Sequence, residues 1–257
     1  MQIKNLNKKY NNKIILENIN FEIETGHILS IIGPNGAGKT TLLKIITGLI
    51  KKYEGEVSIN DNFVYLPENK SLYENYKISK IFKILQKYDN RFDINKAKQF
   101  LNIFELNDDK IINLSNGNRS ILYNIIILST NADLYILDEP VNNIDTIKRN
   151  MIFKFFRDLT FKNKSIIYTS HILTEVEKLA DKTIILNKGK IIENSSIDDL
   201  KENYVAVVSN IPKGYFYKKA GNSNVYIIKK DQLRNEEYEN ISFDIIFEAL
   251  IRGEYNV

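Results

Sequence analysis

Residues 31 to 43 read IIGPNGAGKTTLL, and this stretch decides how the rest of the chain is interpreted. It holds three of the chain's eleven glycines, and the last of these, Gly38, is followed at once by Lys39 and Thr40. The pattern is G-x-x-x-x-G-K-[ST], preceded by an apolar run and followed by apolar residues at helical spacing. Glycine lets the backbone turn its N–H groups inward around an anion, and the following helix adds its dipole. The stretch therefore predicts a phosphate-binding loop between a strand and a helix.

The loop predicts a nucleoside triphosphate as ligand, with Mg²⁺ as its ion. The positively charged side chain of Lys39 is expected to contact the β and γ phosphates, and the Thr40 hydroxyl is expected to bind Mg²⁺. The residues assigned to the nucleotide here are Gly33, Pro34, Asn35, Gly36, Ala37, Gly38, Lys39, Thr40 and Thr41.

Composition and charge exclude several classes of protein. The chain is 43% hydrophobic and 26% charged, as in ordinary globular domains. Its net charge of +4 comes from basic and acidic residues mixed along the chain, so we expect no nucleic-acid partner. Without cysteine there is no disulfide framework and no thiolate metal site, which suits a reducing cytoplasm. No apolar run approaches the roughly 20 residues of a membrane span, and residues 1–10 lack a signal core.

The order of predicted elements indicates an α/β fold. Residues 1–30 alternate as strands do, residues 53–67 hold two more strands around the turn NDN, and residues 71–114 are helical and amphipathic. After Ser115, helices and strands alternate, which implies a parallel sheet with crossover helices. The predicted strands are 27–32, 134–137, 165–169 and 183–187, and the predicted helices 118–130, 146–160 and 172–181.

We therefore predict a P-loop core with a mixed, mainly parallel sheet, an antiparallel N-terminal β subdomain and a short helical insertion at 71–114. Residues 204–257 change character, with apolar alternation and then the amphipathic SFDIIFEALIRG. They predict a small C-terminal α+β extension. The expected division is a nucleotide-binding domain at 1–200 and an extension at 201–257.

Further along the chain, two strand ends carry polar residues. LYILDEP at 134–140 contains an apolar strand that ends in Asp138 and Glu139. Asp138 can hold Mg²⁺ and its water beside a P-loop, and Glu139 is a candidate general base. SIIYTSH ends at His171, where the γ-phosphate is expected, so we interpret this side chain as its sensor. Ser115 and Gly117 precede an amphipathic helix, and by themselves they fit a second anion site or an N-cap alone.

The order of these motifs resembles the ATP-binding cassette (ABC) ATPases over roughly residues 1–200. LSNGN at 114–118 is similar to the family's signature LSGGQ, which contacts ATP held by the opposite subunit. The resemblance implies that Ser115 and Gly117 reach a partner's ATP and that Tyr10 stacks on adenine. It also implies that Asp145 in VNNID lies at a dimer interface. The catalytic residues it implies are Glu139, His171 and Lys39, with Thr40, Asp138 and Glu68 as metal ligands.

Three positions depart from the family's pattern. Glu68 in YLPEN stands where the family usually has a glutamine, and a carboxylate can still reach Mg²⁺. Asn116 and Asn118 replace a glycine and the glutamine of the signature. Because asparagine tolerates a left-handed backbone, we expect Asn116 to keep the turn there. A homodimer with equal sites and a heterodimer with one weaker site both remain open.

The resemblance implies the ATP-hydrolysing subunit of a bacterial exporter of peptide, antibiotic or lipid-like cargo, which works by ATP-driven dimer closure. A separate transmembrane permease would be its partner and would hold it peripherally on the cytoplasmic face of the membrane. The alternatives are an ABC ATPase of an assembly pathway, such as iron–sulfur cluster assembly, and a regulatory subunit that binds ATP without hydrolysing it.

Overall fold

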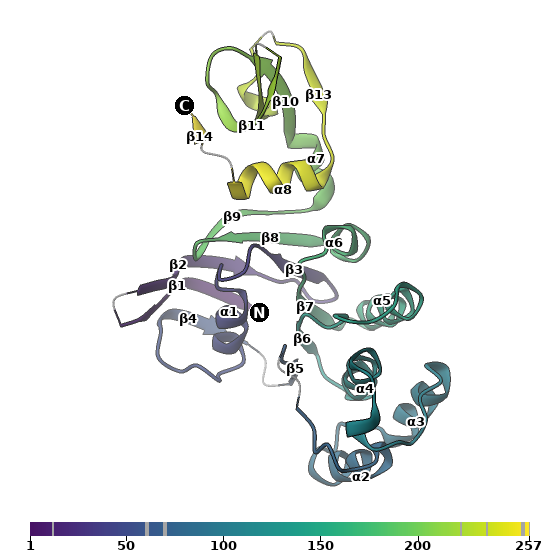
Figure 1. Ribbon diagram of the computed structural model, residues 1–257. Helices are drawn as coiled ribbons and strands as arrows, with labels where there is room; N and C mark the ends of the chain where they lie inside the picture. The colour runs from purple at the N-terminus through teal and green to yellow at the C-terminus, as the bar shows by residue number, and fades with distance from the viewer. Residues whose placement is uncertain are drawn as a thin grey trace.

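The computed structural model describes residues 1–11, 13–59, 62–68, 71–221, 223–234, 236–252 and 255–256 (Figure 1). The strands are β1 (Gln2–Tyr10), β2 (Lys13–Glu22), β3 (Ile28–Ile32), β4 (Glu54–Ser58), β5 (Phe63–Leu66), β6 (Leu134–Asp138), β7 (Ser165–Thr169), β8 (Lys182–Asn187), β9 (Lys190–Ser195), β10 (Tyr204–Ser209), β11 (Gly214–Ala220), β12 (Ser223–Lys229), β13 (Tyr238–Asn240) and β14 (Tyr255–Asn256). The helices are α1 (Lys39–Ile46), α2 (Ile78–Tyr88), α3 (Ile94–Ile103), α4 (Asn116–Leu128), α5 (Thr146–Thr160), α6 (Leu173–Leu179), α7 (Ile197–Asn203) and α8 (Phe243–Arg252), with short 3₁₀ turns η1 (Ile111–Asn113) and η2 (Lys230–Gln232).

A six-stranded sheet in the order β5-β6-β7-β3-β8-β9 forms the centre of the molecule. Strands β5, β6, β7, β3 and β8 run parallel, and β9 pairs antiparallel with β8. Every residue of β3, β6 and β7 is buried, because these continuous apolar runs are covered on both faces. The predicted parallel sheet with crossover helices is confirmed.

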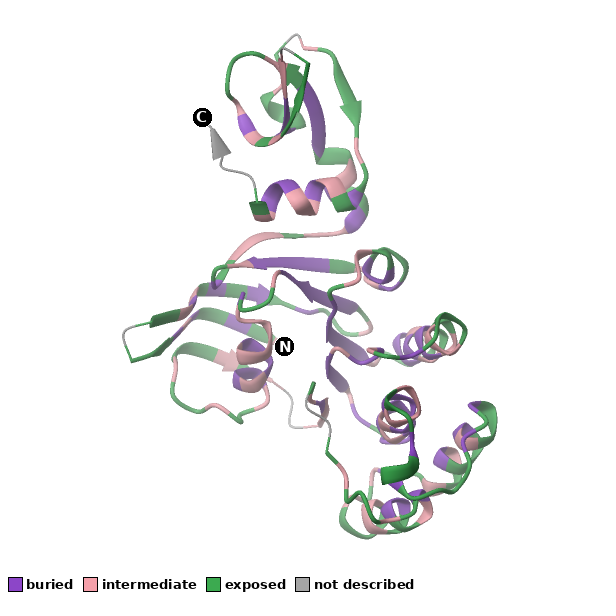
Figure 2. Cartoon of the chain, viewed as in Figure 1, coloured by how far each residue is buried: buried purple, intermediate pink, exposed green. Residues whose placement is uncertain are grey.

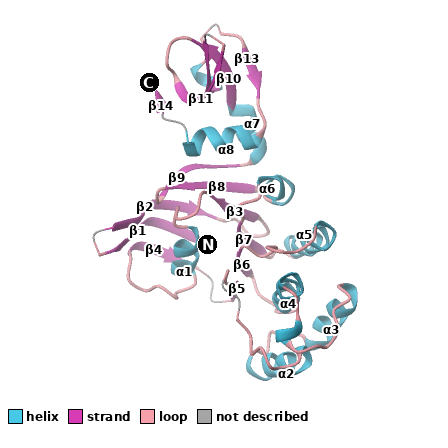
Figure 3. Cartoon of the chain, in the orientation of Figure 1, coloured by secondary structure: helices cyan, strands magenta, loops and turns pink. Residues whose placement is uncertain are grey.

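The two faces of this sheet are covered by different layers. Alternate residues such as Ile28 and Tyr168 belong to a core shared with α4, α5 and the helical region, whereas Leu29 and Ile167 join a core with α1 and the N-terminal strands. Those N-terminal strands form a three-stranded antiparallel sheet, β2-β1-β4, as predicted. Figure 3 shows helices on one side and this small sheet with α1 on the other.

The two strands predicted within residues 53–67 exist, but they lie in different sheets. Strand β4 pairs with β1, and β5 pairs with β6 at the edge of the central sheet. Residues 60 and 61 of the predicted turn are outside the described part of the chain. The helical segment predicted at 71–114 contains α2, α3 and η1.

The C-terminal residues build a separate five-stranded antiparallel sheet, β13-β10-β12-β11-β14, with α8 against it (Figure 1). Helix α8 also packs on α6 and α7, and Asn187 donates a side-chain hydrogen bond to the Ile251 carbonyl. Buried residues of α8 and β10, which are purple in Figure 2, belong to the main core. The predicted boundary between residues 200 and 201 falls inside α7, and the division into two domains stays a prediction.

No helix in the described ranges is long and apolar enough to cross a bilayer.

Candidate active site

The glycine-rich loop connects the carboxyl end of β3 to α1, and neighbouring strands closely approach two of its glycines. A Cβ on Gly33 would lie 2.0 Å from the carbonyl oxygen of Leu186 in β8. A Cβ on Gly38, whose φ is 109°, would lie 2.7 Å from a methyl carbon of Leu16 in β2. Glycine is therefore required at both places by close neighbours and, at Gly38, by the left-handed backbone.

Lys39 lies folded over this loop. Its Nζ donates to the carbonyl oxygens of Gly33 at 2.7 Å and Pro34 at 3.2 Å. Burial lowers the pKa of Lys39, and the negative charges of Glu139, Asp138 and Glu68 oppose that shift. Helix α1 has no side-chain cap and no acidic residue in its first turn. A cation and a helix N-terminus thus converge on one place, which suits an anion.

A cavity of about 710 Å³ lies over the loop. Its lining includes most of the residues predicted for the nucleotide and its ion: Asn35, Gly36, Ala37, Gly38, Lys39, Thr40, Thr41, Glu68, Asp138 and Glu139. Residues that the sequence analysis did not identify also line it: Lys13, Ile14, Ile15, Lys188 and Gly189. The amide of Gly189 donates to the carbonyl of Ala37, so the β8–β9 turn is tied to the loop.

Asp138 ends β6 beside the loop and is 1% exposed. Its Oδ1 accepts a hydrogen bond from the Thr169 hydroxyl at 2.6 Å, because β6 and β7 pair in register at these residues. Among the described residues, its buried Oδ2 has no hydrogen-bond partner. A buried carboxylate oxygen without a partner is costly unless it binds a cation.

This arrangement fits Mg²⁺. The oxygen donors that line the cavity include the Thr40 hydroxyl and the carboxylates of Asp138 and Glu68. In the described ranges no three His, Asp or Glu side chains cluster tightly enough to hold a metal by themselves. Magnesium in nucleotide sites is typically held by one or two protein oxygens together with substrate phosphates.

Glu139 and His171 form a close pair at the ends of β6 and β7. His171 Nδ1 lies 2.9 Å from Glu139 Oε2, and the two side chains are 52% and 13% exposed. The Glu139 backbone has a φ of 49°, and its amide donates to Thr169 Oγ1 at 3.0 Å. A left-handed non-glycine residue is uncommon and here turns a carboxylate toward the cavity.

Thr169 is a positioning residue that was not identified from the sequence. Its hydroxyl donates to the Asp138 carboxylate and accepts from the Glu139 backbone amide. We expect Thr169→Val to lower the free energy of unfolding by about 2–3 kcal/mol, since it leaves a buried carboxylate oxygen and an amide unpaired. Urea denaturation measures the loss, and Mg²⁺ with ATP is expected to recover part of it.

Thr183→Val is the matched control for this substitution. Thr183 is a fully buried threonine on β8 whose hydroxyl pairs with that of Ser30, a neutral group. Its replacement is expected to cost less than Thr169→Val. Equal losses would contradict a special role for the Asp138 contact.

Tyr10 and Glu68 differ in how the structure places them. Glu68 lies in the loop after β5 and lines the cavity, and its role as a metal ligand stays a prediction. Tyr10 ends β1, is 48% exposed and does not line the cavity, although its hairpin neighbour Lys13 does. The Nζ of Lys8 lies 4.3 Å from the centre of its ring. Stacking of Tyr10 on adenine stays a prediction.

The predicted signature residues lie at the start of α4, away from the P-loop cavity. Ser115 caps the helix by accepting from the Asn118 amide at 3.1 Å. Asn116 already belongs to the helix and does not have a positive φ, so its tolerance of a left-handed backbone is not needed there. Glycine is required at position 117 because a Cβ there would lie 2.7 Å from the Asn143 carbonyl oxygen.

Asp145 occupies the N-cap of α5 and accepts from the Lys148 amide at 3.0 Å. A second cavity of about 470 Å³ is lined by Glu68 and Glu139, which also line the first, and by Asn116 and Asn143. The described chain therefore does not bring Ser115, Gly117 and Asp145 to its own P-loop.

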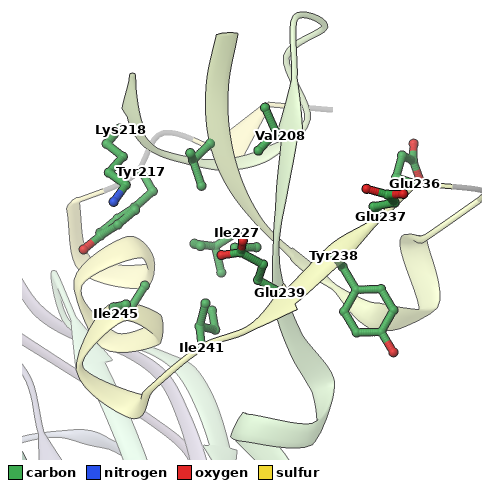
Figure 4. A pocket seen from close by; sticks show the side chains of 12 residues that line it. Val208, Tyr217, Lys218, Ile227, Glu236, Glu237, Tyr238, Glu239, Ile241 and Ile245 are labelled. Atoms are coloured by element: carbon green, nitrogen blue, oxygen red, sulfur yellow. The ribbon is translucent and has the colours of Figure 1, made fainter. Parts of the chain in front are cut away.

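A third cavity, of about 460 Å³, lies between the C-terminal sheet and α8 (Figure 4). Its lining combines aliphatic side chains such as Ile227, Ile241 and Ile245 with the carboxylate of Glu239. None of the residues predicted for nucleotide or metal lines this cavity.

Comparisons with known proteins agree with this geometry. The family model for "ABC transporter" matches residues 16–142. An uncharacterized ABC transporter ATP-binding protein of Methanocaldococcus jannaschii is 33% identical over 82% of this chain and 83% of its own. The zinc import ATP-binding protein ZnuC of a Wolbachia species is 31% identical over 80% of this chain and 90% of its own. A solved ATP-binding subunit of an ABC transporter superposes with a TM-score of 0.71 at 25% identity, covering 78% of this chain and 91% of that one.

Proposed function

Because the chain belongs to the family of ABC transporter ATP-binding proteins, we propose that Lys39, Asp138, Glu139 and His171 carry out its ATP hydrolysis. Binding and hydrolysing ATP to drive transport is the activity of this family. The observation that carries the assignment of residues is the convergence of Lys39 and the two acids on the single cavity over the P-loop. The relatives named above are transport proteins, which favours transport over an assembly pathway.

Each residue has a distinct part in the proposed reaction. The loop amides and Lys39 bind the β and γ phosphates and orient the terminal phosphorus for in-line attack. Thr40, Asp138 and Glu68 would hold Mg²⁺, which neutralises phosphate charge when bound with ATP. Glu139 accepts a proton from the attacking water. His171 Nδ1 holds the Glu139 carboxylate, and its exposed ring would sense the γ-phosphate in this proposal.

The site is completed by a second ATPase subunit in this proposal. Ser115 and Gly117 do not line the chain's own P-loop cavity, so they are available to the ATP of a facing subunit. ATP would close the two subunits around it, and hydrolysis would release them. The partner is a second copy of this chain or a related subunit, and analytical ultracentrifugation of the pure chain with ATP distinguishes these.

The second partner is a transmembrane permease that holds the subunit on the inner face of the cell membrane. We propose export of a peptide, antibiotic or lipid-like cargo, on the basis of the amphipathic C-terminal segment at 242–253. Zinc import is the second candidate, because relatives matched over 80% of the chain are named for it.

Co-purification and transport assays test these proposals. The full-length chain, isolated from native membranes in mild detergent, is expected to bring down a membrane subunit. Reconstituted in vesicles, the complex is expected to couple ATP turnover to movement of an amphipathic peptide or lipid. Zinc uptake without such movement would establish the second candidate, and the absence of any membrane subunit would overturn both.

A further inference from the structure

An ion pair between a half-buried arginine and a buried glutamate lies near the Glu139–His171 contact and belongs to none of the motifs above. Arg149 Nη1 on α5 is 2.5 Å from Glu175 Oε1 on α6. Glu175 is 4% exposed, and burial raises its pKa while the charge of Arg149 opposes the shift. Because desolvation of the buried Glu175 carboxylate offsets much of its attraction to Arg149, stability alone does not account for this pair.

Each partner of the pair also holds a loop next to the catalytic residues. Arg149 Nη2 donates to the Ile144 carbonyl at 2.8 Å, in the segment that runs from Glu139 to α5. Glu175 Oε2 accepts from the Ser170 hydroxyl at 3.3 Å. Since Ser170 precedes His171 in the chain, the ion pair ties the segment after Glu139 to the turn that carries His171.

The Ser170 hydroxyl fixes this turn on both sides of the histidine. It accepts a hydrogen bond from the Ile172 amide at 3.0 Å while it donates to Glu175. The His171 ring itself is half exposed, so its own packing does little to hold it. Its position toward Glu139 therefore depends on the backbone turn, and the turn depends on Glu175.

We propose that Arg149 and Glu175 are positioning residues for ATP hydrolysis. They keep the Ile144 carbonyl and the Ser170 hydroxyl at a fixed separation, so that His171 Nδ1 stays in hydrogen-bond reach of Glu139 Oε2. A misplacement of about 1 Å in a reacting constellation costs on the order of 10²-fold in rate. This inference rests on the roles proposed above for Glu139 and His171.

The chain contains a matched control on the same helix. Arg157 of α5 lies 2.7 Å from the Asp181 carboxylate and donates to the Leu179 carbonyl at 2.6 Å. It joins α5 to the end of α6 with the same chemistry as Arg149. That end of α6 is the one away from His171, so Arg157 has no contact with the catalytic turn.

The experiment compares steady-state ATP turnover of the full-length chain with Glu175→Gln, Arg149→Lys and Arg157→Lys. Glu175→Gln is expected to lower kcat by roughly 10- to 100-fold, with the KM for ATP within about two-fold of the original, because the P-loop is untouched. Arg149→Lys keeps the charge but loses the two-pronged contact, so a smaller loss is expected. The double variant Glu175→Gln/Arg149→Lys is expected to have a kcat no lower than that of Glu175→Gln alone, since both residues act as one unit.

Several outcomes would overturn the proposal. One is an equal fall in kcat for Arg157→Lys and Arg149→Lys at matched unfolding temperatures, which would leave only a structural role. Another is a double variant whose loss is the product of the single losses. If Glu175→Gln does not fold, the comparison of kcat between Arg149→Lys and Arg157→Lys tests the proposal instead. Full turnover in Glu139→Gln and His171→Ala would instead refute the proposed function. If these two variants lose turnover but Glu175→Gln keeps it, only the positioning role is refuted.

Discussion

Glu139→Gln is expected to lower ATP turnover by roughly 10²- to 10⁴-fold while ATP binding is retained, because an amide cannot accept the proton of the attacking water. The substitution keeps the size of the side chain, so the turn at φ 49° and the amide bond to Thr169 remain. ATP is then expected to stay bound and to hold the dimer closed. Phosphate release measures the first effect, and size-exclusion chromatography with Mg²⁺ and ATP measures the second.

Asp133→Asn provides the control for this variant. Asp133 lies just before β6, at the opposite end of the same strand, where it pairs with Lys164 and Asn62. Its loss is expected to affect stability slightly and turnover hardly at all. Turnover in Glu139→Gln equal to that of the unaltered chain would remove Glu139 from the role of base.

Lys39→Ala is expected to abolish measurable ATP binding. A charge-assisted hydrogen bond to phosphate is worth about 1.5–3 kcal/mol, and Lys39 makes such contacts to two phosphate groups in the proposed complex. Among the residues that the structure describes, its Nζ donates hydrogen bonds only to the backbone carbonyls of Gly33 and Pro34 in the loop. The fold is therefore expected to persist. Calorimetric titration with Mg²⁺ and ATP measures the loss of binding.

Lys44→Ala distinguishes a site effect from a general effect on α1. Lys44 lies in the last turn of the same helix, outside the residues that line the cavity. It should bind ATP normally and show the usual rise in unfolding temperature on adding the nucleotide, which Lys39→Ala should lack. A similar rise in both variants would contradict the assignment of Lys39 to the phosphates.

The phosphate-binding loop is the part of this protein that its sequence predicts most directly. A loop that binds an anion through backbone amides uses consecutive residues, so its glycines, Lys39 and Thr40 are all in one short stretch. The strands also follow directly from their apolar runs, and α5 has the bounds that its sequence predicted. The family, the α/β class and the parallel sheet were all within reach of this kind of pattern.

Sequence reasoning failed where a backbone or side chain depends on a distant neighbour. Asn116 was expected to matter as a residue that tolerates a left-handed turn, but it begins α4 in helical geometry. The glycine that matters there is Gly117, because the Asn143 carbonyl approaches it closely. No local pattern separates these two positions, since the neighbour is 26 residues further along the chain.

The sequence by itself determined that this chain has a nucleotide loop, two acids at the end of one strand and a histidine at the end of another. Only the tertiary structure decided which groups support them: Thr169 shared by Asp138 and Glu139, and the Arg149–Glu175 pair behind His171. The physical reason is that ligands of one anion can lie on contiguous backbone, whereas supporting contacts depend on strand register and helix packing. Register and packing bring together residues that no sequence period connects.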